Sequence, residues 1–337
     1  MKSLKETIDG QSPSKVFILA DHLTEQHCLP RLVKSGITYD EIIIVPSGEK
    51  HKSLETCEKI WKRLFGLKAD RKSLLINLGG GVISDMGGFC ASTYMRGMNF
   101  IQVPTTLLSQ VDASIGGKLG VDFYGLKNSI GLFRDPLAVI ADPVFLQTLP
   151  TRELRSGFAE VVKHGLIKDS SLWQEIIAAE TWSAQNWEKV IINSLAVKKA
   201  VVEEDPFETG LRKILNFGHT IGHAIESVMI DMDRPILHGE AIAAGMIAEA
   251  FLSNKTGSLS DEDLKLISDY FTGIYGKLEM DSVSADKLIK KMQSDKKNRG
   301  AEINFTFLTK IGGSTFNQTA NKEEIVESLS YYDSYQN

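Results

Sequence analysis

Three of the chain's seven histidines lie between residues 219 and 238. His219 and His223 are four residues apart, so on a helix both imidazoles would project from one face. His238 follows in the sequence Leu-His-Gly-Glu. Two imidazoles and a further protein ligand commonly hold a catalytic zinc ion with one position left open for substrate. A pair of helix-capping or core histidines would explain the same spacing. Other motifs of the chain are needed to distinguish these structural roles from a metal site.

A candidate for the remaining ligand lies in Ser-Gly-Phe-Ala-Glu-Val-Val-Lys-His, residues 156–164. Glu160 and Lys163 are three residues apart and would share a helix face. A carboxylate among apolar neighbours is either paired with such a cation or bound to a metal ion. His164 lies off that face, and we interpret it as structural.

A glycine-rich turn, Gly79 to Asp85, follows an apolar run that is typical of a buried strand. Glycines there let the backbone approach a ligand, and the start of the following helix would favour a pyrophosphate. Ser84 replaces the third glycine of a strict dinucleotide motif. The Gly-Gly-Lys at 116–118 is not a P-loop, because Asp112 and Leu119 replace its first glycine and its Ser/Thr. The pattern favours a dinucleotide, with an ordinary tight turn as the alternative.

Small and polar residues continue through Pro104 to Leu108, Val111 to Lys118, and Lys127-Asn128. Such a run packs a core poorly but lets a ligand come close to the backbone. Lys118 and Lys127 would add positive charge to a ligand site. The alternative is a surface loop with solvated lysines, which is the usual environment of a lysine.

Arg212 and Asn216 precede His219 by about one helical turn if the pattern at 212–230 is a single helix. An arginine this close to a metal site suits an anionic substrate, because its guanidinium binds carboxylate or phosphate with two parallel hydrogen bonds. An intrahelical ion pair with Glu208, four residues earlier, is the alternative. The charge run at 295–298, taken alone, is typical of a solvated surface.

Composition limits the class of protein. A chain of 337 residues indicates two domains, and its net charge of -5 argues against nucleic acid as a partner. Cys28, Cys57 and Cys90 show no CxxC spacing, which fits a reducing compartment. The N-terminus lacks the apolar run of a signal peptide, and no apolar stretch of about twenty residues could span a membrane. We therefore expect a cytoplasmic protein.

The two halves of the chain have different patterns. Short apolar runs at 16–21, 41–46, 73–79, 100–104 and 138–142 predict buried strands, with a helix at 53–67 among them. This alternation predicts a Rossmann-like parallel α/β domain over residues 1–150. Residues 151–337 predict a mostly α-helical domain. Its helices are expected at 151–168, 182–205, 212–230, 239–257, 260–275 and 284–296, with one strand at 303–309.

Taken in order, these blocks resemble the 3-dehydroquinate synthases, sugar-phosphate cyclases of the shikimate pathway. The matching motifs run from Ser47-Gly48-Glu49 to Lys297. The strongest are Gly79 to Asp85, Tyr94 to Gly97, Pro104 to Lys118, Lys127-Asn128, Ala159 to Lys163, Asn216 to His223 and His238 to Glu240. The chain departs from the family's pattern at Asp122, where asparagine is common, and at Leu126, which is inserted in the usual Gly-Lys-Asn.

The resemblance implies that Glu160, His219 and His238 bind a metal ion, Zn²⁺ or Co²⁺. His223 would then act on the substrate as an acid–base group, unlike in the simplest helical pairing, where His219 and His223 both bind metal. The other catalytic and substrate-contacting residues it implies are Arg96, Asp112, Lys118, Asn128, Lys163, Lys198, Glu208, Arg212, Asn216 and Lys296, the last preferred to Lys297. The implied NAD contacts are Asp21, Glu49, Lys52, Gly80, Gly81, Asp85, Thr105, Thr106, Lys127, Phe145 and Thr148.

The family's reaction would convert 3-deoxy-D-arabino-heptulosonate 7-phosphate to 3-dehydroquinate and phosphate. It combines transient oxidation by NAD, phosphate elimination, re-reduction, ring opening and an intramolecular aldol closure. A metal ion that grips the substrate hydroxyls and cations that hold its carboxylate and phosphate suit this chemistry. The resemblance also implies a homodimer.

Three other functions remain to be weighed. Another sugar-phosphate cyclase, making 2-deoxy-scyllo-inosose or a valiolone, would share the two-domain plan, but we expect the segment from Asp112 to Lys118 to differ there. A metal-dependent polyol dehydrogenase of the glycerol dehydrogenase type would not need Lys118, Lys198 and Arg212 to bind two anions. A catalytically silent sugar-phosphate sensor would commonly lack a metal ligand or a general base. This chain has all four candidates for these roles: Glu160, His219, His223 and His238.

Overall fold

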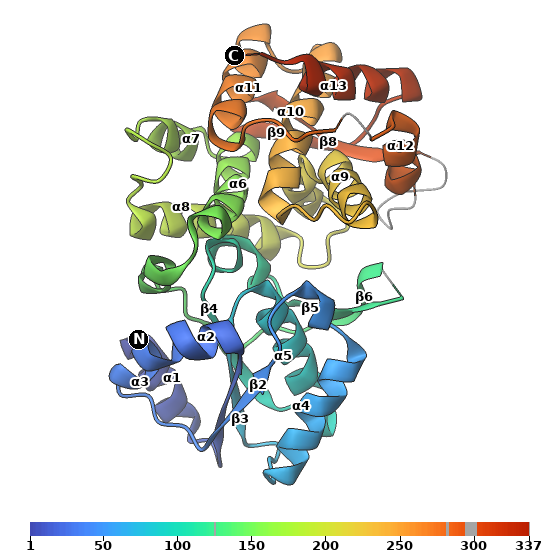
Figure 1. The fold of residues 1–337 in the computed structure, drawn as a ribbon. Helices are drawn as coiled ribbons and strands as arrows, with labels where there is room; N and C mark the ends of the chain where they lie inside the picture. The colour runs from blue at the N-terminus through green and yellow to red at the C-terminus, as the bar shows by residue number, and fades with distance from the viewer. Residues whose placement is uncertain (125, 281–282, 294–301, 337) are drawn as a thin grey trace. The chain divides into compact units, whose positions relative to one another are not determined.

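The computed structural model describes residues 1–124, 126–280, 283–293 and 302–336 (Figure 1). The chain divides into two compact units, Met1–Leu154 and Arg155–Asn337. The first contains a parallel sheet with helices, and the second is mainly helical. Within the described residues, no helix combines the length and the apolar character needed to cross a membrane.

The first unit is an α/β domain built on a five-stranded sheet with strand order β2-β1-β3-β4-β7. All neighbouring pairs in it are parallel, so the predicted fold class is confirmed. The strands are β1 (Val16–Asp21), β2 (Glu41–Val45), β3 (Leu74–Gly79), β4 (Asn99–Pro104) and β7 (Ala138–Val139). The last is shorter than the predicted 138–142.

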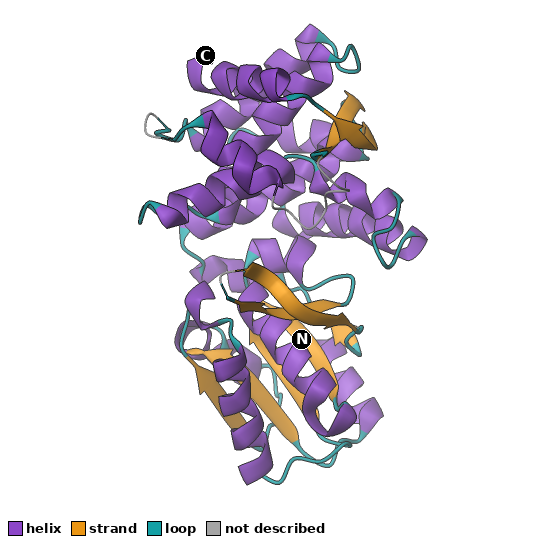
Figure 2. Ribbon diagram, turned by 90° about the vertical axis from the view of Figure 1, so that its right-hand side faces the viewer, coloured by secondary structure: helices purple, strands orange, loops and turns teal. Residues whose placement is uncertain are grey.

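Helices cover both faces of this sheet, as the strands and helices of Figure 2 show. Successive residues of β1 point to opposite faces. Phe17 and Leu19 join a cluster that contains residues of α4 and α5, whereas Ile18 and Ala20 join one that contains Leu4 of α1. The helical elements of this unit are α1 (Lys2–Gln11), α2 (His22–His27), α3 (Leu29–Lys34), η1 (Glu49–His51), α4 (Leu54–Gly66), α5 (Gly81–Thr93), η2 (Tyr94–Arg96), η3 (Ser109–Ala113) and η4 (Pro143–Thr148).

An antiparallel hairpin, β5 (Lys118–Phe123) and β6 (Leu126–Phe133), follows the small-residue segment. Its strands were not predicted, because the glycines that recur through this stretch weaken strand propensity. Two of them, Gly120 and Gly131, face each other across the hairpin. A side chain at Gly131 would lie 2.1 Å from the Leu119 carbonyl oxygen, so the backbone approach itself requires glycine.

The second unit consists mainly of packed helices. Its elements are α6 (Thr151–Ile167, which begins in the first unit), α7 (Ser170–Ile177), α8 (Trp187–Glu204), η5 (Leu211–Asn216), α9 (His219–Asp231), α10 (His238–Lys255), α11 (Asp261–Tyr275), α12 (Ala285–Gln293), β8 (Asn304–Lys310), β9 (Gly313–Thr319) and α13 (Lys322–Ser334). The sequence did not predict α7, β9 or α13, and the described part of the predicted helix at 284–296 ends at Gln293.

The predicted single helix at 212–230 is wrong. A 3₁₀ turn, η5, ends at Asn216, and α9 starts afresh at His219. Gly218 between them has a φ of 78°, in the left-handed region that favours glycine. Arg212 and Asn216 therefore do not share a helix with His219, and the sequence spacing cannot place them on a neighbouring face.

Asp205 organises the chain between α8 and η5. Its Oδ1 accepts the Thr209 amide at 3.0 Å, and its Oδ2 accepts the amides of Gly210 at 2.7 Å and Arg212 at 3.0 Å. Burial alone would raise the pKa of Asp205, but these hydrogen bonds to the ionised carboxylate outweigh it and lower the pKa. The turn that carries Glu208 and Arg212 thus rests on one carboxylate.

We expect Asp205→Asn to destabilise the protein at pH 7 by about 1–3 kcal/mol, because an amide cannot accept all of these N–H groups. The lowered pKa means that the carboxylate's contribution is complete above its unfolded pKa of about 3.9 and is lost as the pH falls through its folded pKa. Urea unfolding of both proteins between pH 7 and pH 3 checks this. The difference in unfolding free energy between the two proteins should become smaller as the pH falls. A difference that stays constant between pH 7 and pH 3 would contradict the role assigned to Asp205.

Candidate active site and metal centre

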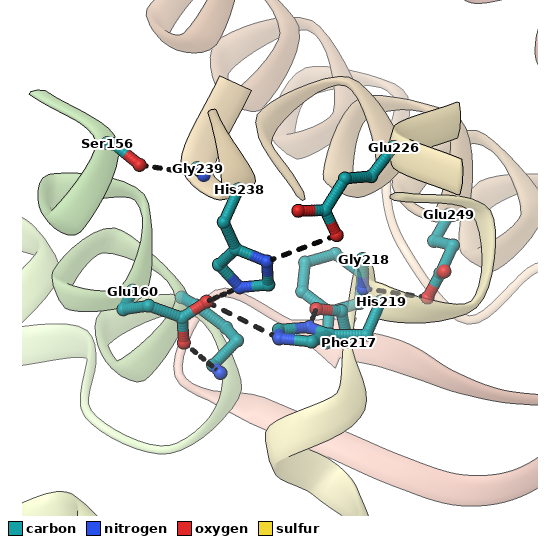
Figure 3. A network of polar contacts seen from close by, with 10 residues as sticks. Ser156, Glu160, Phe217, Gly218, His219, Glu226, His238, Gly239 and Glu249 are labelled. Atoms are coloured by element: carbon teal, nitrogen blue, oxygen red, sulfur yellow. Dashed lines mark hydrogen bonds and ion pairs between the residues drawn. The ribbon is translucent and has the colours of Figure 1, made fainter. Parts of the chain in front are cut away.

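Glu160, His219 and His238 come together from three helices of the second unit. Glu160 lies in the middle of α6, while His219 and His238 are the first residues of α9 and α10. The Glu160 Oε1 atom is 3.4 Å from His219 Nε2 and 3.5 Å from His238 Nε2. Figure 3 shows the carboxylate facing both rings. The structure thus brings together the three residues implied as metal ligands.

Close contact between α6 and the start of α10 sets this arrangement. The Gly239 amide donates to Ser156 Oγ at 2.9 Å (Figure 3). A Cβ atom at Gly239 would lie 1.9 Å from the Ser156 carbonyl oxygen, so no other residue fits there without displacing a helix. Because Glu160 is four residues after Ser156, the contact places it beside His238.

The second nitrogen of each imidazole has its own partner. His219 Nδ1 lies 3.0 Å from the Phe217 carbonyl oxygen, which fixes it as the N–H donor in the neutral ring. His238 Nδ1 lies 3.8 Å from Glu226 Oε2 on α9. Partners of this kind orient histidine ligands, leaving the Nε2 lone pair for a metal. Glu226 was missed from the sequence, and its signal was a carboxylate at a buried position of an apolar helix.

Charge is concentrated around Glu160, whose side chain is fully buried. Burial alone would raise its pKa, but the Lys163 ammonium, in direct contact with Oε2, and His219 hold the pKa of Glu160 well below its usual range. Burial alone would lower the pKa of His238, but the Glu160 and Glu226 carboxylates raise it to about 9. The site therefore holds an anionic carboxylate next to two imidazoles, which is a suitable donor set for a divalent cation.

One orphaned atom tests whether a metal ion fits. Within the described residues, the buried Glu160 Oε1 has no hydrogen-bond partner, although it faces two imidazole nitrogens. Leaving a buried carboxylate oxygen without a partner is costly, and a cation between it and the imidazoles would supply one. His223 lies nearby, because nitrogen atoms of His219, His223 and His238 are within 4.8 Å of one another. The donor types and their proximity fit a zinc-like ion.

Further cationic side chains of the second unit are buried, which is unusual for lysine and arginine. Lys163 is 1% exposed, Lys198 on α8 is 5% exposed and Arg212 in η5 is 2% exposed. Arg212 Nη1 donates to the Pro206 carbonyl oxygen, and Asn216 Nδ2 donates to Glu208 Oε1 at 2.8 Å. Buried positive charge in the unit that carries the candidate metal ligands suits an anionic ligand.

In the first unit, the glycine turn lies between β3 and α5, as predicted. Gly80 is the N-cap of α5, and its Cβ would lie 3.1 Å from Thr106 Cγ2 after β4. Lys52 Nζ contacts Asp85 Oδ2 at 2.5 Å, and Lys52 is only 3% exposed. Burial alone would lower the pKa of Lys52, but the Asp85 carboxylate outweighs it and raises the pKa. These residues meet at the carboxyl ends of neighbouring strands, where open parallel sheets bind ligands.

The remaining residues of the implied NAD set have different surroundings. Asp21 ends β1 and caps α2 by accepting the Thr24 amide at 2.9 Å. Phe145 is buried in an apolar cluster, and Thr148 Oγ1 contacts its carbonyl oxygen at 3.4 Å. Thr105 is buried, Glu49 begins η1, and Lys127 is exposed on β6.

The implied substrate residues of the first unit lie on several elements. Asp112 is in η3, Lys118 is exposed at the start of β5, and Asn128 is exposed on β6 with a φ of 49°. Arg96 lines an open hollow of about 610 Å³ together with Asp70, Arg71, Lys72 and Met95. Lys296 and Lys297 lie outside the described residues.

The chain matches family models along most of its length. Residues 42–156 match the model "3-dehydroquinate synthase N-terminal", and residues 157–298 match "3-dehydroquinate synthase C-terminal". The 3-dehydroquinate synthase of Parabacteroides distasonis is 42% identical over 333 residues, which cover 98% of this chain and 94% of that protein.

Solved structures of two related cyclases share the fold. The 2-epi-5-epi-valiolone synthase of Streptomyces hygroscopicus, with NAD⁺ and Zn²⁺ bound, has a TM-score of 0.84 at 24% identity, covering 95% of this chain and 90% of that one. A 2-deoxy-scyllo-inosose synthase, complexed with carbaglucose-6-phosphate, NAD⁺ and Co²⁺, has a TM-score of 0.83 at 25% identity, covering 97% of this chain and 93% of that one. The matched ranges extend over both units and contain Glu160, His219 and His238, and the chain belongs to the 3-dehydroquinate synthase family.

Proposed function

We propose that this protein is a 3-dehydroquinate synthase, an NAD- and metal-dependent lyase. It converts 3-deoxy-D-arabino-heptulosonate 7-phosphate to 3-dehydroquinate and phosphate. The observation that carries the proposal is the cluster of Glu160, His219 and His238, found in a chain of this family with buried lysines and an arginine in the same unit. A metal site beside buried positive charge suits a sugar acid that carries both a carboxylate and a phosphate.

Glu160, His219 and His238 would hold the divalent cation, zinc or cobalt. When bound, the cation polarises substrate hydroxyl groups for oxidation. Lys163 keeps Glu160 ionised, and Phe217 and Glu226 orient the two imidazoles. His223, one turn after His219 on α9, holds or moves a proton at its imidazole during elimination and ring closure.

The first unit binds NAD, with the backbone of Gly80 and Gly81 at the start of α5 receiving the pyrophosphate. NAD held there would accept a hydride from the substrate and later return it, so that no net redox change occurs. The Lys52–Asp85 pair joins the second turn of α5 to the residue that follows η1. The other contacts of this set are Asp21, Glu49, Thr105, Thr106, Lys127, Phe145 and Thr148.

Cationic and polar groups bind the substrate's two anionic ends. Lys198, Arg212 and Asn216 belong to the second unit, where Asp205 and Glu208 shape the turn before η5. The resemblance to the family adds Arg96, Asp112, Lys118, Asn128 and Lys296 to this set. Many contacts around one small molecule retain its reactive intermediates until the ring has closed.

Other cyclases and polyol dehydrogenases are weaker alternatives. The family models and the relatives at about 40% identity are 3-dehydroquinate synthases, and the segment from Asp112 to Lys118 is intact. A polyol dehydrogenase would have no use for the buried Lys198 and Arg212. The family resemblance also supports a homodimer, which light scattering of the purified protein would test.

The activity itself can be tested by incubating the protein with the heptulosonate phosphate and a catalytic amount of NAD. Phosphate release and absorbance at 340 nm are followed together. We expect stoichiometric phosphate with no lasting NADH, because the hydride returns to the product. Net NADH formation from a polyol, without phosphate release, would instead identify a dehydrogenase.

Replacing a metal ligand should remove the metal. We expect His238→Ala to lose bound zinc and to lower kcat by at least about 100-fold, because only two of the three ligands remain. Elemental analysis of protein dialysed against a weak chelator measures the loss. His22→Ala, which removes an exposed histidine of the first unit, is the control. Full zinc content in His238→Ala would exclude it as a ligand.

Arg212 should contribute to substrate binding. We expect Arg212→Ala to weaken binding of a carboxylate-bearing substrate analogue by about 10- to 100-fold, the loss of a charge-assisted contact. Titration calorimetry with NAD and zinc present measures the dissociation constant. The neighbouring Lys213→Ala, whose ammonium contacts Asn317, should leave it unchanged. Equal affinity in Arg212→Ala and the unmodified protein would refute the assignment.

A further inference from the structure

Glu249, on α10, is a fully buried carboxylate outside the proposed chemistry. Its Oε2 accepts the Gly218 amide at 2.8 Å, and its Oε1 accepts the Ile221 amide at 3.1 Å. Figure 3 shows Glu249 directed at Gly218, immediately before His219. Burying a charge is costly unless strong hydrogen bonds compensate it, so these two contacts call for an explanation.

Both amides belong to the start of α9. The first amides of a helix have no partner within the helix, and a side chain of the N-cap residue usually satisfies one of them. The N-cap of α9 is Gly218, which has no side chain. Glu249 does this from the neighbouring helix, and its negative charge also suits the positive end of the helix dipole.

Glycines allow Glu249 on α10 to contact the start of α9. The helices α9 and α10 lie side by side (Figure 1), and a Cβ at Gly245 would lie 2.1 Å from the Gly218 carbonyl oxygen. At Gly222, a Cβ would lie 3.0 Å from the Ala241 carbonyl oxygen. With the backbones this close, a glutamate on α10 can cap α9 directly.

We propose that Glu249 is a positioning residue for the metal centre. The inference rests on the proposed metal site. His219 is the first residue of α9, so the direction of its ring follows from how that helix end is held. His238 begins α10, the same helix that carries Glu249. Helix α10 thus supplies His238 and, through Glu249, positions His219. His223, one turn after His219 on α9, depends on the same hydrogen bonds.

The test compares metal binding in Glu249→Ala and Glu249→Gln with the unmodified protein. Zinc affinity is measured by competition with a chromophoric chelator, and the visible absorption of the Co²⁺-loaded protein reports the ligand geometry. We expect Glu249→Ala to bind zinc about 10- to 100-fold more weakly, with an altered cobalt spectrum. Glu249→Gln keeps one acceptor oxygen, so its affinity should lie closer to that of the unmodified protein.

Leu252→Ala is the matched control, because Leu252 is equally buried on α10, three residues further along. It should lower Tm without changing the cobalt spectrum or zinc affinity. Folded Glu249→Ala with unchanged affinity and spectrum would overturn the proposal, as would an equal loss in Leu252→Ala. If Glu249→Ala does not fold, the test uses Glu249→Gln. A weaker zinc affinity with an altered cobalt spectrum in this variant supports the positioning role of Glu249, and an unchanged affinity and spectrum reject it. An unmodified protein that binds neither metal would instead refute the proposed metal site.

Discussion

The structure of the second unit depends on one buried charge, the Glu160 carboxylate. It has no access to water, and Lys163 on the same helix keeps it ionised. Its other oxygen faces the Nε2 atoms of His219 and His238. An uncompensated carboxylate in such a place would be too costly to keep. Lys163 compensates one carboxylate oxygen, and a cation between Oε1 and the two imidazoles would supply a partner for the other.

The cluster is assembled from helix starts, where backbone amides need outside partners. His219 and His238 begin α9 and α10, and both starts are held by side chains of other helices. Ser156 on α6 accepts the Gly239 amide, and Glu249 on α10 accepts the Gly218 amide. The same hydrogen bonds that complete these helices also set the directions of the imidazoles.

Glycine determines how closely these parts approach. Gly239 lies against the backbone of α6, and Gly245 against the backbone around Gly218. In the first unit, Gly80 similarly lets the start of α5 approach Thr106, which follows β4. Positions that look featureless in the sequence thus fix the distances on which the candidate metal and nucleotide sites depend.

The sequence by itself determined the α/β character of the first unit, because buried parallel strands leave continuous apolar runs such as Val16 to Asp21. The histidine spacing also indicated a metal site, and the resemblance to the family implied Glu160, His219 and His238 as its candidate ligands. The sequence could not show that the helix expected at 212–230 breaks at Gly218, or that Glu226 and Glu249 face the site. Those features arise from contacts between residues far apart in the chain. Local propensity and periodicity describe only neighbouring residues and give no information about such contacts. Only the tertiary structure decided them.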